Sequence, residues 1–99
     1  MLVGIMKFVS MSEVEALREC LDFIRNGYVD VFSSSNKDWS LWKLRHAYNG
    51  NTLIILATHG YYDIKKNGEQ VKRRFIKDDG SRYMATLGSD GNVVSVRLK

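Results

Sequence analysis

The last third of the chain, from Val71 to Lys99, constrains the fold most, because two turn signals interrupt runs of alternating apolar residues. These signals are Asp78-Asp79-Gly80 and Asp90-Gly91. A sequence that ends in Asp-Gly and lies between alternating apolar residues is typical of a β-hairpin. The pattern therefore predicts three consecutive antiparallel strands.

The two turns also predict how these strands pair. A two-residue turn at Asp90-Gly91 sets apolar residues opposite one another on one side, and a slip of one residue would mix the two faces. The expected apolar pairs are Leu87 with Val94, Ala85 with Val96, and Tyr83 with Leu98. A three-residue loop at 78–80, with a bulge at Gly80, pairs Phe75 with Tyr83, Arg73 with Ala85, and Val71 with Leu87. Arg73 is the exception on this face, and we expect it to reach an edge or to meet a carboxylate.

Two more hairpins are expected upstream, across Asn49-Gly50 and Asn67-Gly68. The first predicts a core face with pairs of His46 with Leu53, Leu44 with Ile55, and Trp42 with Ala57. A short helix at 37–45 is an open alternative for its first strand. The second predicts pairs of Ile64 with Val71, Asp63 with Lys72, and Tyr61 with Arg74, the last as a cation–π contact.

One amphipathic helix is expected to begin near residue 11. Two overlapping capping boxes, Ser10 with Glu13 and Ser12 with Glu15, mark its start, and Gly27 is a natural C-cap. The apolar stripe contains Val14, Leu17, Cys20, Leu21, Phe23 and Ile24. The acidic residues Glu13, Glu15, Glu19 and Asp22 are expected to lie mostly on the solvated side.

The remaining segments complete a single α+β domain over residues 1–99. Met1 to Val9 is apolar and predicts a buried edge strand, although Met6 is an alternative start of the natural chain. The segment is too short to cross a bilayer and lacks the features of a secretory signal, so we expect no membrane association. Tyr28 to Phe32 predicts a short strand. The predicted architecture is one amphipathic helix packed on one face of a five- to six-stranded antiparallel β-meander.

Charge and cysteine content bear on the compartment and on the kind of partner. The formal charge is +4, and residues 37–99 hold twelve basic and six acidic groups, so this expected strand-rich part is the basic part. A single cysteine, Cys20, excludes an internal disulfide and fits the cytoplasm. His46, His59 and Cys20 do not have the spacing of a zinc site, and we expect no metal or other cofactor.

The predicted registers gather basic residues on the sheet face that the helix leaves open. Such a face can hold phosphates by charge and can stack a base on an aromatic ring, so we expect a module that binds RNA or DNA. A solvated face whose charges keep the protein soluble is the alternative reading. The candidate binding residues are Lys43, Arg45, Tyr61, Lys72, Arg74, Arg82, Arg97 and Lys99.

Two other functions remain open at this stage. The first is a protein-binding module, such as an inhibitor of a host factor encoded by a phage or a mobile element, with Trp39 and Trp42 at the interface. The second, by analogy of fold alone, is a metal-independent ribonuclease of the small-toxin type, for which the sequence contains no motif. Its candidate catalytic residues are His59, Tyr61, Arg74, Arg82 and Lys99. Binding ranks above catalysis, and an uncovered sheet edge also allows a homodimer.

Overall fold

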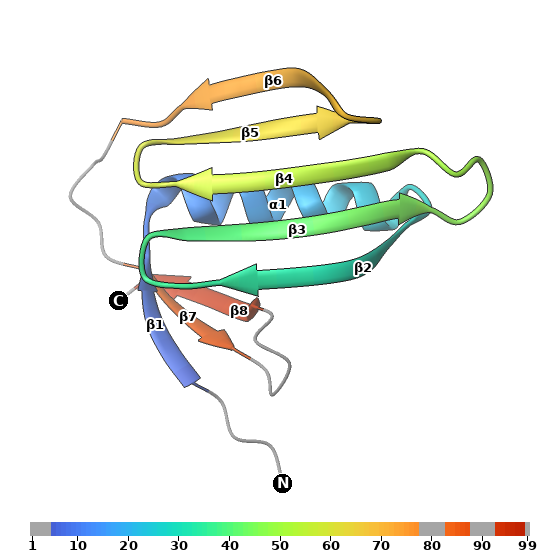
Figure 1. Cartoon of the computed structure of the whole chain (residues 1–99). Coiled ribbons are helices and arrows are strands. Elements are labelled where there is room, and N and C mark those ends of the chain that lie inside the picture. Colours follow the sequence, from blue (N-terminus) through green and yellow to red (C-terminus); the bar gives the residue numbers. More distant parts are fainter. Residues whose placement is uncertain (1–4, 78–82, 88–92, 99) are drawn as a thin grey trace, which may run out of the picture.

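The computed structural model describes residues 5–77, 83–87 and 93–98. These residues form one helix and eight strands (Figure 1). The elements in chain order are β1 (Ile5–Val9), α1 (Met11–Arg25), β2 (Tyr28–Ser35), β3 (Trp39–His46), β4 (Thr52–Thr58), β5 (Tyr61–Lys66), β6 (Glu69–Phe75), β7 (Tyr83–Leu87) and β8 (Val93–Leu98). The predicted α+β architecture is confirmed, because α1 packs on a five-stranded antiparallel meander of β2 to β6.

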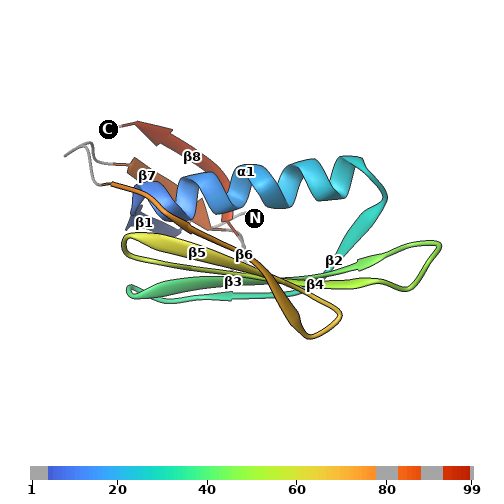
Figure 2. The same cartoon turned by 90° about the horizontal axis from the view of Figure 1, so that it is seen from above.

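The strands divide into two sheets, which the sequence did not indicate. The large sheet has the order β2-β3-β4-β5-β6, and a small sheet has the order β1-β7-β8. Figure 2 shows that α1 and the small sheet lie on the same side of the large sheet. The predicted hairpin between β6 and β7 is therefore wrong, since β1 pairs with β7 from Ile5–Leu87 to Val9–Tyr83 and occupies that edge. The pairs Phe75–Tyr83, Arg73–Ala85 and Val71–Leu87 do not form, and their turn lies outside the described residues.

The hairpin of β7 and β8 follows the predicted register along most of its length. Tyr83 lies opposite Leu98 and Ala85 opposite Val96, as expected. A bulge after Thr86 then sets Leu87 opposite Val93 in place of Val94. The alternation of residues thus predicted the pairing until one extra residue entered the ladder. The Asp90-Gly91 turn itself lies outside the described residues.

Residues 39–46 form a strand and not the alternative helix. The predicted faces of the β3–β4 hairpin are confirmed, but its register differs by two residues. Leu44 lies opposite Leu53 and Trp42 opposite Ile55. The connection is longer than a two-residue turn, with the amide of His46 donating to the carbonyl of Asn51 at 2.8 Å. A shift of two residues leaves each side chain on its face, which explains why the core of this hairpin was predicted correctly.

The β5–β6 hairpin turns at Asn67 and Gly68 as predicted, with positive φ at both residues. A register shift between Ile64 and Lys65 then displaces the pairing by one residue. Ile64 therefore lies opposite Lys72, and Tyr61 lies opposite Phe75. A shift of one residue exchanges the two faces of β6, so the three predicted pairs of this hairpin are wrong.

The main core lies between α1 and the inner face of the large sheet. Ala16 and Cys20 of α1 contact this face, and the helical stripe is narrower than predicted, since Leu21 and Ile24 are exposed. Burial, with a further contribution from Asp30, raises the pKa of the Cys20 thiol to about 12, so this cysteine is inert core filler. The sheet contributes Trp42, Leu44, Leu53, Ile55, Ala57, Tyr62 and Ile64.

The start of α1 is tied to the sheet by buried polar groups. Ser10 is the N-cap and forms the predicted capping box with Glu13, whereas Ser12 lies inside the helix and donates to the carbonyl oxygen of Thr58. Glu13 is only 3% exposed and accepts a hydrogen bond from Ser40. The expectation that Glu13 is solvated is therefore wrong. At this position the capping box brings the carboxylate against β3.

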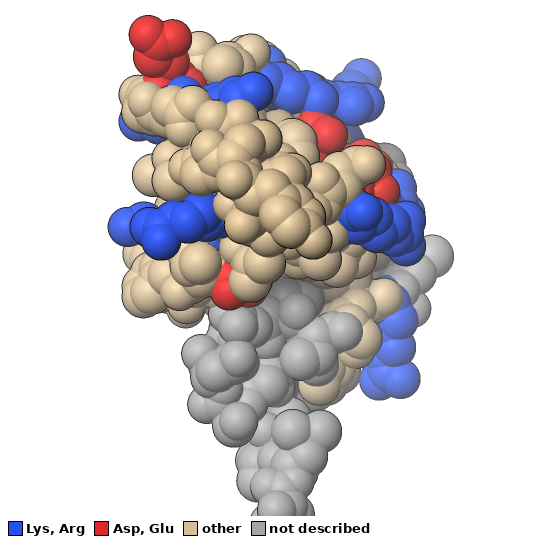
Figure 3. Space-filling view, turned by 90° about the vertical axis from the view of Figure 1, so that its right-hand side faces the viewer, with Lys and Arg blue, Asp and Glu red and all other residues tan. Residues whose placement is uncertain are grey.

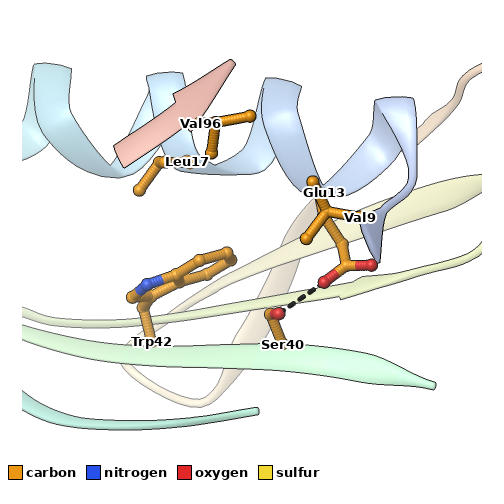
Figure 4. A pocket seen from close by; sticks show the side chains of 6 residues that line it. All are labelled: Val9, Glu13, Leu17, Ser40, Trp42 and Val96. Atoms are coloured by element: carbon orange, nitrogen blue, oxygen red, sulfur yellow. Dashed lines mark hydrogen bonds between the residues drawn. The ribbon is translucent and has the colours of Figure 1, made fainter. Parts of the chain in front are cut away.

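The small sheet is held against α1 by a second apolar cluster. Val9 and Val14 are buried, and Tyr83 and Val96 pack against them. Figure 4 shows the narrow crevice where β1, α1, β3 and β8 meet. It is too narrow to hold a water molecule, so the two sheets and the helix pack closely where they meet.

Candidate functional site

The outer face of the large sheet is the candidate functional surface. Alternation along each strand directs the core residues toward α1 and their neighbours toward the opposite side. No described element covers that opposite side, as Figure 2 shows. Hereafter it is called the open face.

The registers arrange the open face in rows that run across the strands. One row joins Phe32, Lys43, Ile54 and Lys65 from β2 to β5. The next row joins Leu41, Leu56, Asp63 and Arg73 from β3 to β6. A third row joins Trp39, Thr58, Tyr61 and Phe75. Basic, apolar and aromatic side chains therefore occupy successive rows of one surface.

The electrostatic balance of the open face is positive. The registers place four basic residues on it, and Asp63 is the one carboxylate among its described residues, which gives a formal charge of +3. The basic residues are Lys43, Arg45, Lys65 and Arg73. Lys43 and Arg45 are exposed, and the Lys43 ammonium lies 5.5 Å from the centroid of the Phe32 ring. Acidic ligands would therefore meet cations beside aromatic rings.

Asp63 and Arg73 form a bidentate ion pair on the open face. Nε and Nη2 of Arg73 donate to the two carboxylate oxygens of Asp63 at 2.7 and 2.8 Å. These hydrogen bonds outweigh the effect of burial and hold the pKa of Asp63 below its usual value, while they raise the pKa of Arg73. The Arg73 guanidinium also lies 4.6 Å from the centroid of the Tyr61 ring. The expectation that Arg73 meets a carboxylate is confirmed.

Two predicted binding residues, Lys72 and Arg74, lie on the other side of β6. Their partners across the strands are Ile64 and Tyr62, which are core residues. Lys72 forms an ion pair with Glu19 of α1 and lies over the ring of Tyr62. The structure therefore separates Lys72 and Arg74 from Lys43, Arg45 and Tyr61.

The contact between Lys72 and Glu19 joins the edge of the sheet to the helix. The hydroxyl of Tyr62 also donates to Glu19, at 2.8 Å. Desolvation raises the pKa of Glu19, but hydrogen bonds from Lys72 and Tyr62 and the nearby positive charges outweigh it, so this pKa lies below its usual value. The helical pattern suggested that Glu19 is solvated, but in the structure its carboxylate is held by Lys72 and Tyr62. Glu19 fastens β6 to α1.

The remaining basic candidates are dispersed or lie outside the described residues. Arg97 is exposed on β8 in the small sheet, while Arg82 and Lys99 are not described. Figure 3 views the end of the molecule at the β3–β4 turn and shows Lys and Arg side chains on both flanks of a broad region of other residues. The single continuous basic face that the sequence predicted is therefore not assembled.

The catalytic candidates of the ribonuclease alternative are not gathered into a cluster. His59 is exposed in the β4–β5 turn, where its Nε2 lies 3.1 Å from the carbonyl oxygen of Lys37. Tyr61 is on the open face, whereas Arg74 is on the side of the helix. Of the two tryptophans, Trp39 is half-buried on the open face and Trp42 is 4% exposed in the core. Trp42 is therefore a core residue, as its predicted place on the core face of the β3–β4 hairpin indicated, and only Trp39 of these two interface candidates is accessible to a partner.

Sequence reasoning missed Arg73 and Phe75 as residues of the open face. Phe75 is 73% exposed, and its ring centroid lies 5.7 Å from that of Tyr61. Their position depends on the one-residue bulge in the β5–β6 hairpin, for which the sequence carries no local signal.

The described residues show no sign of a metal site or of a membrane-spanning helix. Among the residues that the structure describes, His, Cys, Asp and Glu side chains form no group of three or more that could hold a metal ion. The described part of the chain also contains no helix with the length and apolar character needed to span a bilayer. The comparisons with protein-family models, with curated proteins and with solved structures find no match. The function is therefore inferred from the side chains themselves.

Proposed function

We propose that this protein is a non-enzymatic module that binds nucleic acid through the open face. The observation that carries the proposal is the row in which Lys43 and Lys65 flank Ile54 beside the exposed Phe32 ring. Two cations that lie two strands apart on one face can neutralise phosphates of one nucleic-acid strand, and adjacent aromatic rings can contact its bases. The formal charge of +3 on the face supports an anionic partner.

Binding is preferred to catalysis because the described catalytic candidates are dispersed. A general acid or base must lie within hydrogen-bond reach of the reacting group. Tyr61 and Arg74 lie on opposite faces of the sheet, so they cannot act on one phosphate together. The buried, unpaired Cys20 fits a cytoplasmic location, where such a module would meet nucleic acid.

The test is fluorescence anisotropy with labelled single-stranded RNA, duplex RNA and duplex DNA at several salt concentrations. The test variant is Lys43→Gln/Lys65→Gln, which removes two charges from the open face. The control is Arg18→Gln/Arg25→Gln, which removes two exposed charges from α1. Both Arg side chains form surface ion pairs that contribute little to stability, so the control also folds.

We expect tight binding at low salt and a steep loss of affinity as salt rises. For single strands, losing two phosphate contacts lowers the slope of log K against log salt by about 1.4. The control variant keeps the slope of the wild-type protein. Failure of the wild-type protein to bind any of the three ligands at low salt would overturn the proposal and favour a protein partner. Cleavage of the RNA on a gel would favour the ribonuclease alternative.

A further inference from the structure

The open face contains one cluster whose geometry is fixed by several independent contacts. Asp63 holds the Arg73 guanidinium through two parallel hydrogen bonds. The Arg73 guanidinium lies over the Tyr61 ring, and the Phe75 ring lies 5.7 Å from the Tyr61 ring, centroid to centroid, and is tilted by 48° to it. We call Tyr61, Arg73 and Phe75 the planar platform.

The contact with Asp63 changes what Arg73 can offer to a ligand. A fork-to-fork pair fixes the plane of the guanidinium and neutralises much of its charge. Asp63 is 7% exposed, while the Arg73 side chain keeps 44% of its surface exposed. Arg73 therefore offers a ligand a flat guanidinium surface that is held in place, and not a freely moving positive charge. Because Asp63 already holds the Arg73 side chain in the unbound protein, Arg73 loses little conformational entropy when a ligand binds.

Flat π-systems are the ligands that such a surface suits. Unpaired nucleobases stack on aromatic rings and on guanidinium planes, whereas the bases of a duplex are already stacked on one another. Phosphates alone would gain little here, because Asp63 opposes them. The cations available to phosphates are Lys43 and Lys65, and Lys65 lies about 13 Å along β5 from Tyr61.

We infer that the planar platform is the subsite that stacks an unpaired base, so that the ligand of the open face is a single strand. This inference rests on the proposed function and specifies its ligand. Phosphates further along the same strand lie over the row of Lys43 and Lys65. The apolar row between them, with Leu41 and Leu56, is covered by the sugars and bases of the same strand.

The decisive variants separate stacking from charge. Arg73→Lys keeps the charge but removes the planar fork, so we expect affinity for a single-stranded oligonucleotide to fall about fivefold or more. The salt slope should stay unchanged. Asp63→Asn removes a negative charge and loosens Arg73. Simple electrostatics predicts tighter binding of this variant, whereas the planar platform predicts weaker binding.

Two further variants, one in the platform and one outside it as a control, guard against a general effect on folding. Phe75→Ala removes a ring that is 73% exposed, and Tyr48→Ala removes a ring that is 92% exposed in the β3–β4 turn, away from the platform. Both variants should fold, as urea unfolding can verify. We expect Phe75→Ala to weaken binding of single strands and Tyr48→Ala to leave it unchanged.

The outcomes also distinguish this inference from the proposed function. Equal affinity for single strands and duplexes, with Arg73→Lys and Phe75→Ala both neutral, would overturn the planar platform. If Lys43→Gln/Lys65→Gln still weakened binding in that case, the open face would remain the nucleic-acid surface. Absence of any binding by the wild-type protein would overturn both. Stronger binding by Asp63→Asn would count against stacking on Arg73.

Discussion

Ser40 donates a hydrogen bond of 2.6 Å to the carboxylate of Glu13, and both side chains are almost completely buried. Glu13 also accepts from the amide and hydroxyl of Ser10 in the capping box (Figure 4 shows its contact with Ser40). One carboxylate thus joins the first turn of α1 to the third strand. It stands at the junction where the two sheets meet the helix.

Replacing Glu13 should therefore destabilise the fold. We expect Glu13→Ala to lower the free energy of unfolding by about 2–3 kcal/mol, because it removes a cap and weakens the hydrogen bonding of buried hydroxyls. Glu15→Ala on the same turn is the control. Its exposed pair with Arg18 contributes less than about 1 kcal/mol. Urea unfolding measures both, and equal losses would contradict this role of Glu13.

Gly27 should resist substitution for a reason that Gly50 does not share. Both have positive φ, +102° and +75°, but a Cβ on Gly27 would lie 2.8 Å from Nε2 of His46, whereas Gly50 faces open space. We expect Gly27→Ala to cost about 1–3 kcal/mol and Gly50→Ala about 1 kcal/mol at most. The measurement is thermal or urea unfolding of each variant.

The steric part of the Gly27 effect can be isolated with a double-mutant cycle. In the background of His46→Ala the clash is absent, so Gly27→Ala should cost less than it does in the wild-type protein. An unchanged cost would show that backbone strain alone is responsible.

Stability should decrease on acidification through Glu19 and Asp63. Both carboxyl groups have a pKa below the usual value in the folded protein, because their partners Lys72 and Arg73 favour the ionised form. Their contribution is therefore present above the unfolded-state pKa of about 4 and is lost as pH falls through the folded-state pKa. Urea unfolding at pH 7 and pH 3 measures it. Glu19→Gln and Asp63→Asn should each reduce the difference between the two pH values.

The outer edge of β2 should support self-association at high concentration. Val29, Val31 and Phe32 are each just over half exposed there, and Asp30 is the one charged residue of the strand. The opposite edge, β6, carries four charged residues, which discourage pairing with another copy. We expect a concentration-dependent dimer in sedimentation experiments that Val31→Lys abolishes. Val71→Lys on β6 is the control, and dissociation by both variants or by neither would contradict pairing through β2.

Local patterns in the sequence predicted the parts of this fold that depend on neighbouring residues. The capping box at Ser10, the apolar stripe around Cys20 and the inner faces of β3 and β4 follow from helical or alternating periodicity. The division into two sheets does not, because β1 and β7 pair across nearly the whole sequence. The Asp78-Asp79-Gly80 segment resembles a hairpin turn, but the strands on its two sides belong to different sheets.

The candidate site was harder to predict than the fold, because one extra residue in a strand moves the following side chains to the opposite face of the sheet. One bulge in the β5–β6 hairpin turned Lys72 and Arg74 toward the helix and brought Arg73 and Phe75 to the open face. Lys43, Arg45 and Tyr61 were placed correctly, since no one-residue shift intervenes within the β3–β4–β5 pairing. Composition shows that a chain is basic, but the register of each strand decides where the charge lies.

The pairing of β1 with β7 has a consequence for the order of folding during synthesis. β1 leaves the ribosome before the other elements described here, yet its partner emerges only after α1 and all five strands of the large sheet. Helix and meander can assemble from contacts between near neighbours, whereas closing β1 onto β7 must overcome the entropy of a much longer loop. The nascent chain therefore carries an unpaired apolar strand until its last third is translated. In that interval, chaperones and stray strands can compete for β1.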